Sequence, residues 1–152
     1  MKITAYDLAQ RFIGVREIPG TPDNPQVLAM LRLDSAWAQN DEVPWCSAFV
    51  NYIAWLLRLP RSKSLAARSW LSVGRPIGLD EAKVGFDVVI LSRGRAPQPG
   101  PEVIAAQGHV GFFAGRSLDH FSLLGGNQGD TVSVGQYDVG RVLGVRRLYQ
   151  EG

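Results

Sequence analysis

The chain has 152 residues, of which 45% are apolar and 20% are charged. This length and composition predict a single domain, residues 1–152, with one core, and they exclude a disordered chain. The formal net charge is only +2 and the basic residues are scattered, which argues against a nucleic-acid-binding protein. No apolar run approaches the ~18–20 residues of a membrane span, so we expect no membrane insertion.

The ends and the cysteine count limit the chemistry further. The N-terminus lacks the apolar core of a signal peptide, so we expect synthesis in the cytoplasm and another route to any site of action outside. The single cysteine, Cys46, excludes an internal disulfide and a multi-cysteine metal site. The two histidines are far apart and no calcium-loop pattern occurs, so we expect no metal and no other cofactor.

The first half of the chain is predicted to be helical. Thr4, followed three residues later by Asp7, has the pattern of a helix cap, and apolar residues at helical spacing continue to Gly14. Further helices are expected at about residues 27–31, 46–59 and 65–71.

The second half has the pattern of a sheet, with β-branched residues between turn signals. Strands are expected at residues 87–91, 109–114, 121–124, 131–134 and 142–148, with a long loop at 92–108 and a tight loop at 125–130. Helices that precede an antiparallel sheet predict an α+β fold, in which N-terminal helices pack on a C-terminal sheet.

Cys46 is the candidate nucleophile. It follows Pro44 and Trp45 at a predicted helix start, where unpaired backbone N–H groups and the helix dipole favour the reactive thiolate. Its own backbone N–H is a candidate donor to an oxyanion. A lone cysteine is more often a small buried apolar residue, but the position at a helix start and the histidine described next favour the catalytic interpretation.

His109 is the candidate base. It opens an apolar strand, and Gly108 and Gly111 leave room for another group to approach the backbone. The competing His120 lies between two predicted strands and is expected to be an exposed turn residue. A thiol at a helix start and an imidazole at a strand start are what a thiol hydrolase needs.

Asn127 is the candidate residue that orients the imidazole. It follows the strand after that of His109, and antiparallel pairing of the two strands would bring its side chain near His109. The run Gly-Gly-Asn-Gln-Gly is also an ordinary turn sequence, so Gln128 and Asp130 are alternatives.

Other polar and aromatic residues are candidates for contact with a substrate. We assign Trp45, Glu42, Gln128 and Glu17 to substrate binding, and Asp41 to substrate binding or loop fixation. Trp37 is expected in the core or in a groove, and Trp70 in the core. A pair of glycosidase carboxylates, such as Glu17 and Glu42, is also compatible with the sequence.

The three motifs around these residues resemble a known family. Residues 41–51 (Asp-Glu-Val-Pro-Trp-Cys-Ser-Ala-Phe-Val-Asn), 108–111 (Gly-His-Val-Gly) and 126–128 (Gly-Asn-Gln) resemble the CHAP and NlpC/P60 group of papain-like cysteine hydrolases. A small bacterial and phage branch of that group is most similar, residues 17–20 and 24–25 also fit it, and the similarity extends from about residue 9 to 147.

The resemblance implies a papain-like fold and cleavage of an amide bond in peptidoglycan. It implies Cys46 as nucleophile, His109 as base and then acid, and Asn127 as the orienting residue. Many CHAP proteins carry a glutamate two residues before that asparagine, whereas this chain has Gly125. The acids that bind calcium in some CHAP domains are missing, so the resemblance implies no metal.

The function expected from the sequence is therefore a peptidoglycan hydrolase that works through a cysteine thioester. It would be an N-acetylmuramoyl-L-alanine amidase or a peptide endopeptidase, and either a phage endolysin or an antibacterial effector acting in the periplasm or after release. We expect a monomer with peptidoglycan as partner and a holin or an immunity protein in its system. The alternatives are a papain-like acyltransferase or amide hydrolase with a small intracellular substrate, and a non-catalytic wall-binding module.

Overall fold

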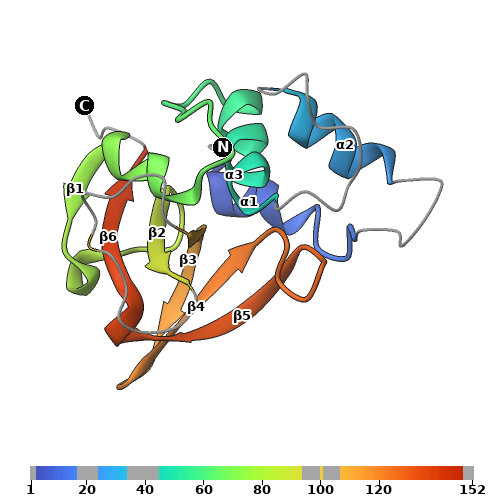
Figure 1. The fold of residues 1–152 in the computed structure, drawn as a ribbon. Helices are drawn as coiled ribbons and strands as arrows, with labels where there is room; N and C mark the ends of the chain where they lie inside the picture. The colour runs from blue at the N-terminus through green and yellow to red at the C-terminus, as the bar shows by residue number, and fades with distance from the viewer. Residues whose placement is uncertain (1–2, 17–23, 34–44, 94–99, 101–106, 149–152) are drawn as a thin grey trace.

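The computed structural model describes residues 3–16, 24–33, 45–93, 100 and 107–148. Its helices are α1 (Ala5–Gln10), α2 (Pro25–Arg32), α3 (Cys46–Leu56) and the short 3₁₀ segments η1 (Ala67–Ser72), η2 (Leu79–Glu81) and η3 (Val139–Arg141). Its strands are β1 (Arg75–Ile77), β2 (Asp87–Ser92), β3 (Gly108–Arg116), β4 (His120–Gly125), β5 (Ser133–Asp138) and β6 (Val142–Arg147). The predicted α+β class, with helices before an antiparallel sheet, is confirmed (Figure 1).

The strands form one antiparallel sheet in the order β1-β6-β2-β3-β4-β5. The central strand β2 is buried along its whole length. Its register with β3 pairs Leu91 with His109 and Ser92 with Gly108. His109 therefore lies at the end of the sheet where β2 finishes and β3 begins.

The curved sheet separates two apolar clusters, as the twofold period of strand side chains requires. Figure 1 shows α1 and α3 gathered on one side of the sheet, and α2 packs on α3. The residues that face these helices include Val88, Ile90, Val110, Phe112 and Leu124. The other face buries Val89, Leu91, Phe113, Phe121, Leu123 and Val145.

The N-terminal helix begins as its cap sequence predicts. The Thr4 hydroxyl accepts a hydrogen bond from the Asp7 N–H at 3.0 Å, and the Asp7 carboxylate accepts one from the Thr4 N–H at 3.1 Å. The helix ends earlier than predicted, at Gln10. The chain then turns through Gly14, whose φ of +98° suits glycine, and its N–H donates to the Val132 carbonyl.

The central helix α3 is held on several sides. Its apolar residues pack on the sheet and on the neighbouring helices, and its buried polar residues bind the segment that follows it. The Ser47 hydroxyl donates to the Ser64 carbonyl at 2.6 Å and accepts from the Trp70 indole N–H at 3.0 Å. Trp70 is fully buried, so its predicted place in the core is confirmed. These bonds fix the helix, and with it the position of Cys46.

Further elements also differ from the predictions, and three of them have a clear cause or form. The short edge strand β1 gave no sequence signal because it has three residues and contains Pro76, which is tolerated only at a sheet edge. The helix expected at 65–71 is the 3₁₀ segment η1. The strand expected at 131–134 begins later, at Ser133, because Thr131 forms an isolated bridge with Arg16.

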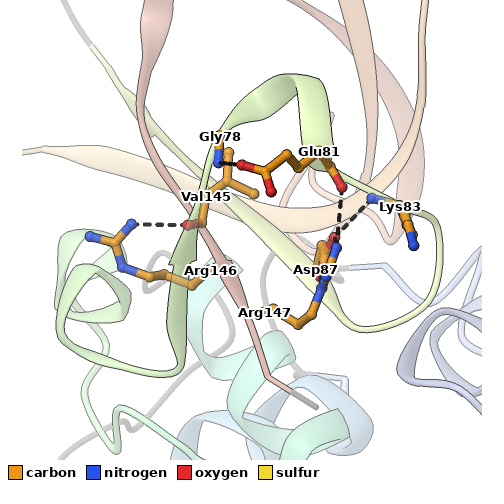
Figure 2. Close-up of polar contacts among 7 residues, drawn as sticks. All are labelled: Gly78, Glu81, Lys83, Asp87, Val145, Arg146 and Arg147. Atoms are coloured by element: carbon orange, nitrogen blue, oxygen red, sulfur yellow. Dashed lines mark hydrogen bonds and ion pairs between the residues drawn. The ribbon is translucent and has the colours of Figure 1, made fainter. Parts of the chain in front are cut away.

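A buried ion pair ties β6 to the start of β2 (Figure 2). The Arg147 guanidinium makes two bonds to the Asp87 carboxylate, at 2.8 and 2.9 Å, and a third to the Glu81 carbonyl at 3.1 Å. The Asp87 side chain is 1% exposed and also accepts from the Lys83 N–H at 2.8 Å. Without this carboxylate the Arg147 guanidinium, whose side chain is only 12% exposed, would lose both of its charge-assisted bonds to β2.

We therefore expect Asp87→Asn to lower the free energy of unfolding by about 3 kcal/mol, the usual cost of breaking a buried pair from one side. Urea denaturation at pH 7 measures this loss. The matched control is Asp80→Asn, which breaks the exposed pair with Arg116 at 3.2 Å and should cost far less. Equal losses in the two variants would contradict the structural role of the Asp87 pair.

None of the helices in the described ranges is long and apolar enough to cross a membrane.

Candidate active site

The Cys46 thiol lies at the first residue of α3, against the start of β3. It accepts a hydrogen bond from the backbone N–H of Val110, and it also lies near the N–H groups of Ser47 and of Cys46 itself. Val110 directly follows His109 in β3. The candidate nucleophile and the candidate base, 63 positions apart in the sequence, therefore meet at one end of the sheet.

The thiol is not ionised at neutral pH, contrary to the expectation from its position at a helix start. Only 3% of Cys46 is exposed, and this burial raises the pKa of the thiol above its ordinary value. The hydrogen bonds from Val110 and Ser47 and the charge of Arg93 act in the opposite direction, but they are weaker than desolvation. Cys46 does begin a helix, but burial raises the pKa of its thiol by more than the backbone N–H groups there lower it.

His109 is also neutral at physiological pH. The residue is 5% exposed, and burial lowers the pKa of its imidazole to about 4. The hydrogen bond with Gln128 opposes this shift, whereas the charges of Arg93 and Arg141 add to it. The resting pair is therefore a neutral thiol and a neutral imidazole, and His109 is free to accept a proton.

Gln128 determines which imidazole nitrogen carries the proton. Its Nε2 donates to the Leu123 carbonyl at 3.2 Å and to the Ser133 carbonyl at 2.7 Å, which assigns the amide oxygen to the side of His109. That oxygen lies 2.8 Å from His109 Nε2, so Nε2 must carry the hydrogen and donate it. Nδ1 is then the nitrogen with a free lone pair, as a general base requires.

Tyr137 on β5 is a second neighbour of the imidazole that the sequence did not indicate. Its hydroxyl lies 3.3 Å from His109 Nε2, and the two rings are 5.4 Å apart at a tilt of 30°. Burial raises the pKa of Tyr137, so the phenol is protonated. Tyr137 therefore closes the side of His109 that faces β5 and limits how the ring can rotate.

Asn127 is not the residue that contacts the imidazole, which corrects the first choice from the sequence. Strand β4 ends at Gly125, and the chain then turns through Asn127 with a φ of +60°. Because of this turn the β3–β4 pairing does not extend to Asn127, and among the described residues no hydrogen bond joins it to His109. The neighbouring Gln128, which the sequence offered as the alternative, makes the contact instead.

Gly125 explains how Gln128 fits beside the ring. A Cβ atom on residue 125 would lie 2.7 Å from Gln128 Oε1 and 3.4 Å from His109 Nε2. A side chain at this position would thus point at the imidazole, but the amide of Gln128 occupies that space. The Gln128 amide therefore fills the space beside the imidazole that a side chain on residue 125 would otherwise enter.

The predicted substrate-binding residues lie in different places. Trp45 is fully buried and packs in the core rather than on a groove, and Gln128 uses its amide on His109 and the backbone, so the structure does not support a substrate contact for either. His120 is exposed, as expected, but it is the first residue of β4 rather than a turn residue. Glu17, Trp37, Asp41 and Glu42 lie outside the described residues. Within those residues, no three His, Cys, Asp or Glu side chains gather to hold a metal ion.

Two arginines that the sequence analysis did not single out border the site. Arg93 follows the last residue of β2, and Arg141 on η3 donates from Nε and Nη2 to the Ser92 carbonyl at 3.1 and 2.9 Å. The Arg141 guanidinium lies 5.4 Å from the centre of the Tyr137 ring. No local motif marks these residues, because the pairing of β6 with β2, which sets Val142 opposite Leu91 and so brings Arg141 beside Ser92, joins segments that are far apart in the sequence.

Comparison with known proteins supports the fold. The chain matches no family model and no curated protein sequence. Among solved structures it is similar to NlpC1 from Trichomonas vaginalis, with a TM-score of 0.57 and 18% sequence identity. The match covers 97% of this chain and 44% of that protein, so this chain spans less than half the length of its structural neighbour. The chain thus has an NlpC/P60-like, papain-like α+β fold.

A pair of variants tests which residue contacts the imidazole. In Gln128→Glu a carboxylate replaces the amide beside Nε2 and favours imidazolium, so the pKa of His109 should rise well above its value of about 4. The control Asn127→Asp adds the same charge one residue away and should raise it much less. NMR titration of the His109 ring protons measures both. A larger shift in Asn127→Asp would restore Asn127 as the orienting residue.

The low pKa of His109 also predicts how stability depends on pH. The unfolded chain binds the His109 proton near pH 6.5 and the folded chain only near pH 4, so stability is full above about 6.5 and falls as the pH drops toward 4. The total loss is about 3 kcal/mol. Urea denaturation of the wild type and of His109→Gln between pH 7 and 4 measures this loss. Carboxylates titrate in both proteins, so the difference between the two curves isolates the contribution of His109. Parallel pH dependence in the two proteins would show that the folded imidazole protonates normally.

Proposed function

We propose that this chain is a cysteine hydrolase of amide bonds and that its substrate is peptidoglycan. One observation carries the proposal. The thiol of Cys46 accepts a hydrogen bond from the N–H of Val110, the residue next to His109. Gln128 holds the His109 ring through Nε2 and leaves Nδ1 free. A nucleophile, a base and a group that orients the base are the parts of a thiol–imidazole site. The likeness of fold to NlpC1 and the three sequence motifs support the substrate class.

The proposed reaction begins from the neutral pair. As the Cys46 sulfur attacks the amide carbonyl carbon, its proton passes to Nδ1 of His109, so the thiolate need not exist in the resting enzyme. The oxyanion that forms lies near the first turn of α3, where the Cys46 N–H has no helical partner. His109 then protonates the leaving nitrogen and the C–N bond breaks. Water, deprotonated by His109, attacks the thioester and releases a carboxylic acid and the thiol.

The biological setting follows from the substrate. A protein that cleaves the wall as an amidase or endopeptidase would be a phage endolysin or an antibacterial effector. Either would act in the periplasm or after release from the cell. As a monomer with peptidoglycan as its partner, the protein would be paired with a holin in the first case and with an immunity protein in the second.

We expect Cys46→Ala and His109→Ala to reduce the release of soluble fragments from purified cell walls by at least about a thousandfold, since each removes a reacting group. Turbidity and mass spectrometry of the fragments measure the rate and identify the bond that is cut. The matched control is His120→Ala, which removes the exposed histidine and should keep wild-type activity. Wall clearance that survives in Cys46→Ala would refute the cysteine mechanism.

The burial of both side chains favours one alternative, acyl transfer to an amine. A thioester formed at a site that is 3% and 5% exposed is screened from bulk water. Digestion in H₂¹⁸O separates the two outcomes, because hydrolysis places one ¹⁸O in the new carboxylate and transfer to an amine places none.

A further inference from the structure

Two arginines lie at the end of the sheet where β2 finishes and β3 begins, next to His109. Arg93 directly follows Ser92, which pairs with Gly108, and Arg141 is bonded to the carbonyl of the same Ser92. We propose that Arg93 and Arg141 bind a carboxylate of the substrate, carried within about three residues of the amide that Cys46 attacks. This inference rests on the proposed function and narrows its substrate class to acidic peptides.

The distance to the reacting groups follows from a stack of three side chains. The Arg141 guanidinium carbon is 5.4 Å from the centre of the Tyr137 ring, and that ring is 5.4 Å from the His109 ring. Two such steps span about three residues of extended peptide, at roughly 3.3–3.6 Å each. A carboxylate bound by Arg141 would therefore belong to the same short peptide as the amide at Cys46.

Both guanidinium groups retain donors for an anion. Arg141 uses one N–H of Nε and one of Nη2 on the Ser92 carbonyl, which leaves three of its five N–H groups. Arg93 is exposed. In the part of the chain that the structure describes, neither arginine forms an ion pair, whereas Arg116 and Arg147 are paired with Asp80 and Asp87. An arginine that keeps several donors is suited to bidentate binding of a carboxylate.

The positive charges of these arginines act on the reacting groups. The charge of Arg93 lowers the pKa of Cys46, His109 and Tyr137 alike, and the charge of Arg141 lowers those of His109 and Tyr137. A buried, uncharged site faced by two cations attracts anions and repels cations. If Arg141 served only to hold the backbone at Ser92, the presence of a second arginine, Arg93, at the same end of the sheet would stay unexplained.

Alkylation of Cys46 tests the proposal without knowledge of the natural substrate. Iodoacetate and iodoacetamide deliver the same carbon to the sulfur with loss of iodide, but only iodoacetate is an anion. The ratio of their rate constants with Cys46, divided by the same ratio with glutathione, measures the preference for a carboxylate. We expect a value of about ten or more, which corresponds to one charge-assisted hydrogen bond, and it should fall with added salt.

Variants of the two arginines test whether they cause the preference for iodoacetate. Arg93→Gln and Arg141→Gln should each lower the ratio several-fold, and the double variant should bring it close to one. Arg141→Lys keeps the charge and should retain most of the preference, and the matched control Arg116→Gln, at the far end of β3, should leave it unchanged. A wild-type ratio near one, or a ratio that the double variant does not lower, would overturn the proposal. A thiol that reacts with neither reagent would also overturn it, because no carboxylate could then approach.

A second measurement uses peptidoglycan peptides with free or amidated carboxylates. The wild type should cleave the acidic peptides with a kcat/KM about tenfold higher, and the ratio should fall in Arg93→Gln. Equal cleavage of both would refute the anion site and leave the hydrolase intact. No cleavage of either, together with a clear preference for iodoacetate, would refute the peptidoglycan substrate and leave the anion site intact.

Discussion

The candidate site depends on one close contact, between the start of α3 and the loop after β4. A Cβ atom on Gly126 would lie 2.7 Å from Phe49 Cβ and 2.8 Å from the ring of Trp45. Both aromatic residues are fully buried. Trp45 precedes the nucleophile and Gly126 lies two residues before Gln128, so this contact places the thiol and the residue that orients the base. Residue 126 must be glycine, because any side chain would push these two parts of the site apart.

The sequence was sufficient to locate the candidate nucleophile and base, because the signals for both are local. A helix start at Cys46 and a strand start at His109 follow from hydrophobic pattern and turn residues within a few positions of each. The partner of the imidazole was ambiguous, because a single residue of difference in the turn decides between Asn127 and Gln128, and the left-handed φ of Asn127 is not visible in the sequence. Tyr137 and Arg141 were missed for another reason. Tyr137 reaches His109 from β5, with β4 between the two strands, and Arg141 is brought to the site by the pairing of β6 with β2, and no local pattern encodes either contact.

The ionisation state of the site shows why local reasoning about charge failed. A helix start and nearby N–H groups do lower the pKa of Cys46, as expected from the sequence, but burial raises it by more. The same burial acts on His109 with the opposite sign, because its charged form is the protonated one. Desolvation thus keeps both groups uncharged and prevents a resting thiolate–imidazolium pair. In the proposed reaction, proton transfer would then accompany attack rather than precede it.

The two arginines connect this resting state to substrate binding. The charge of Arg93 favours a thiolate at Cys46, but the charges of both arginines oppose a proton on His109. In the free protein they therefore hinder the proton transfer to His109 that attack requires. A carboxylate bound between them would offset that repulsion and raise the proton affinity of His109. It would do so at the moment when the amide arrives beside the thiol. A neutral peptide would leave both positive charges uncompensated, so the same groups that bind an acidic substrate would also slow reaction with a neutral one.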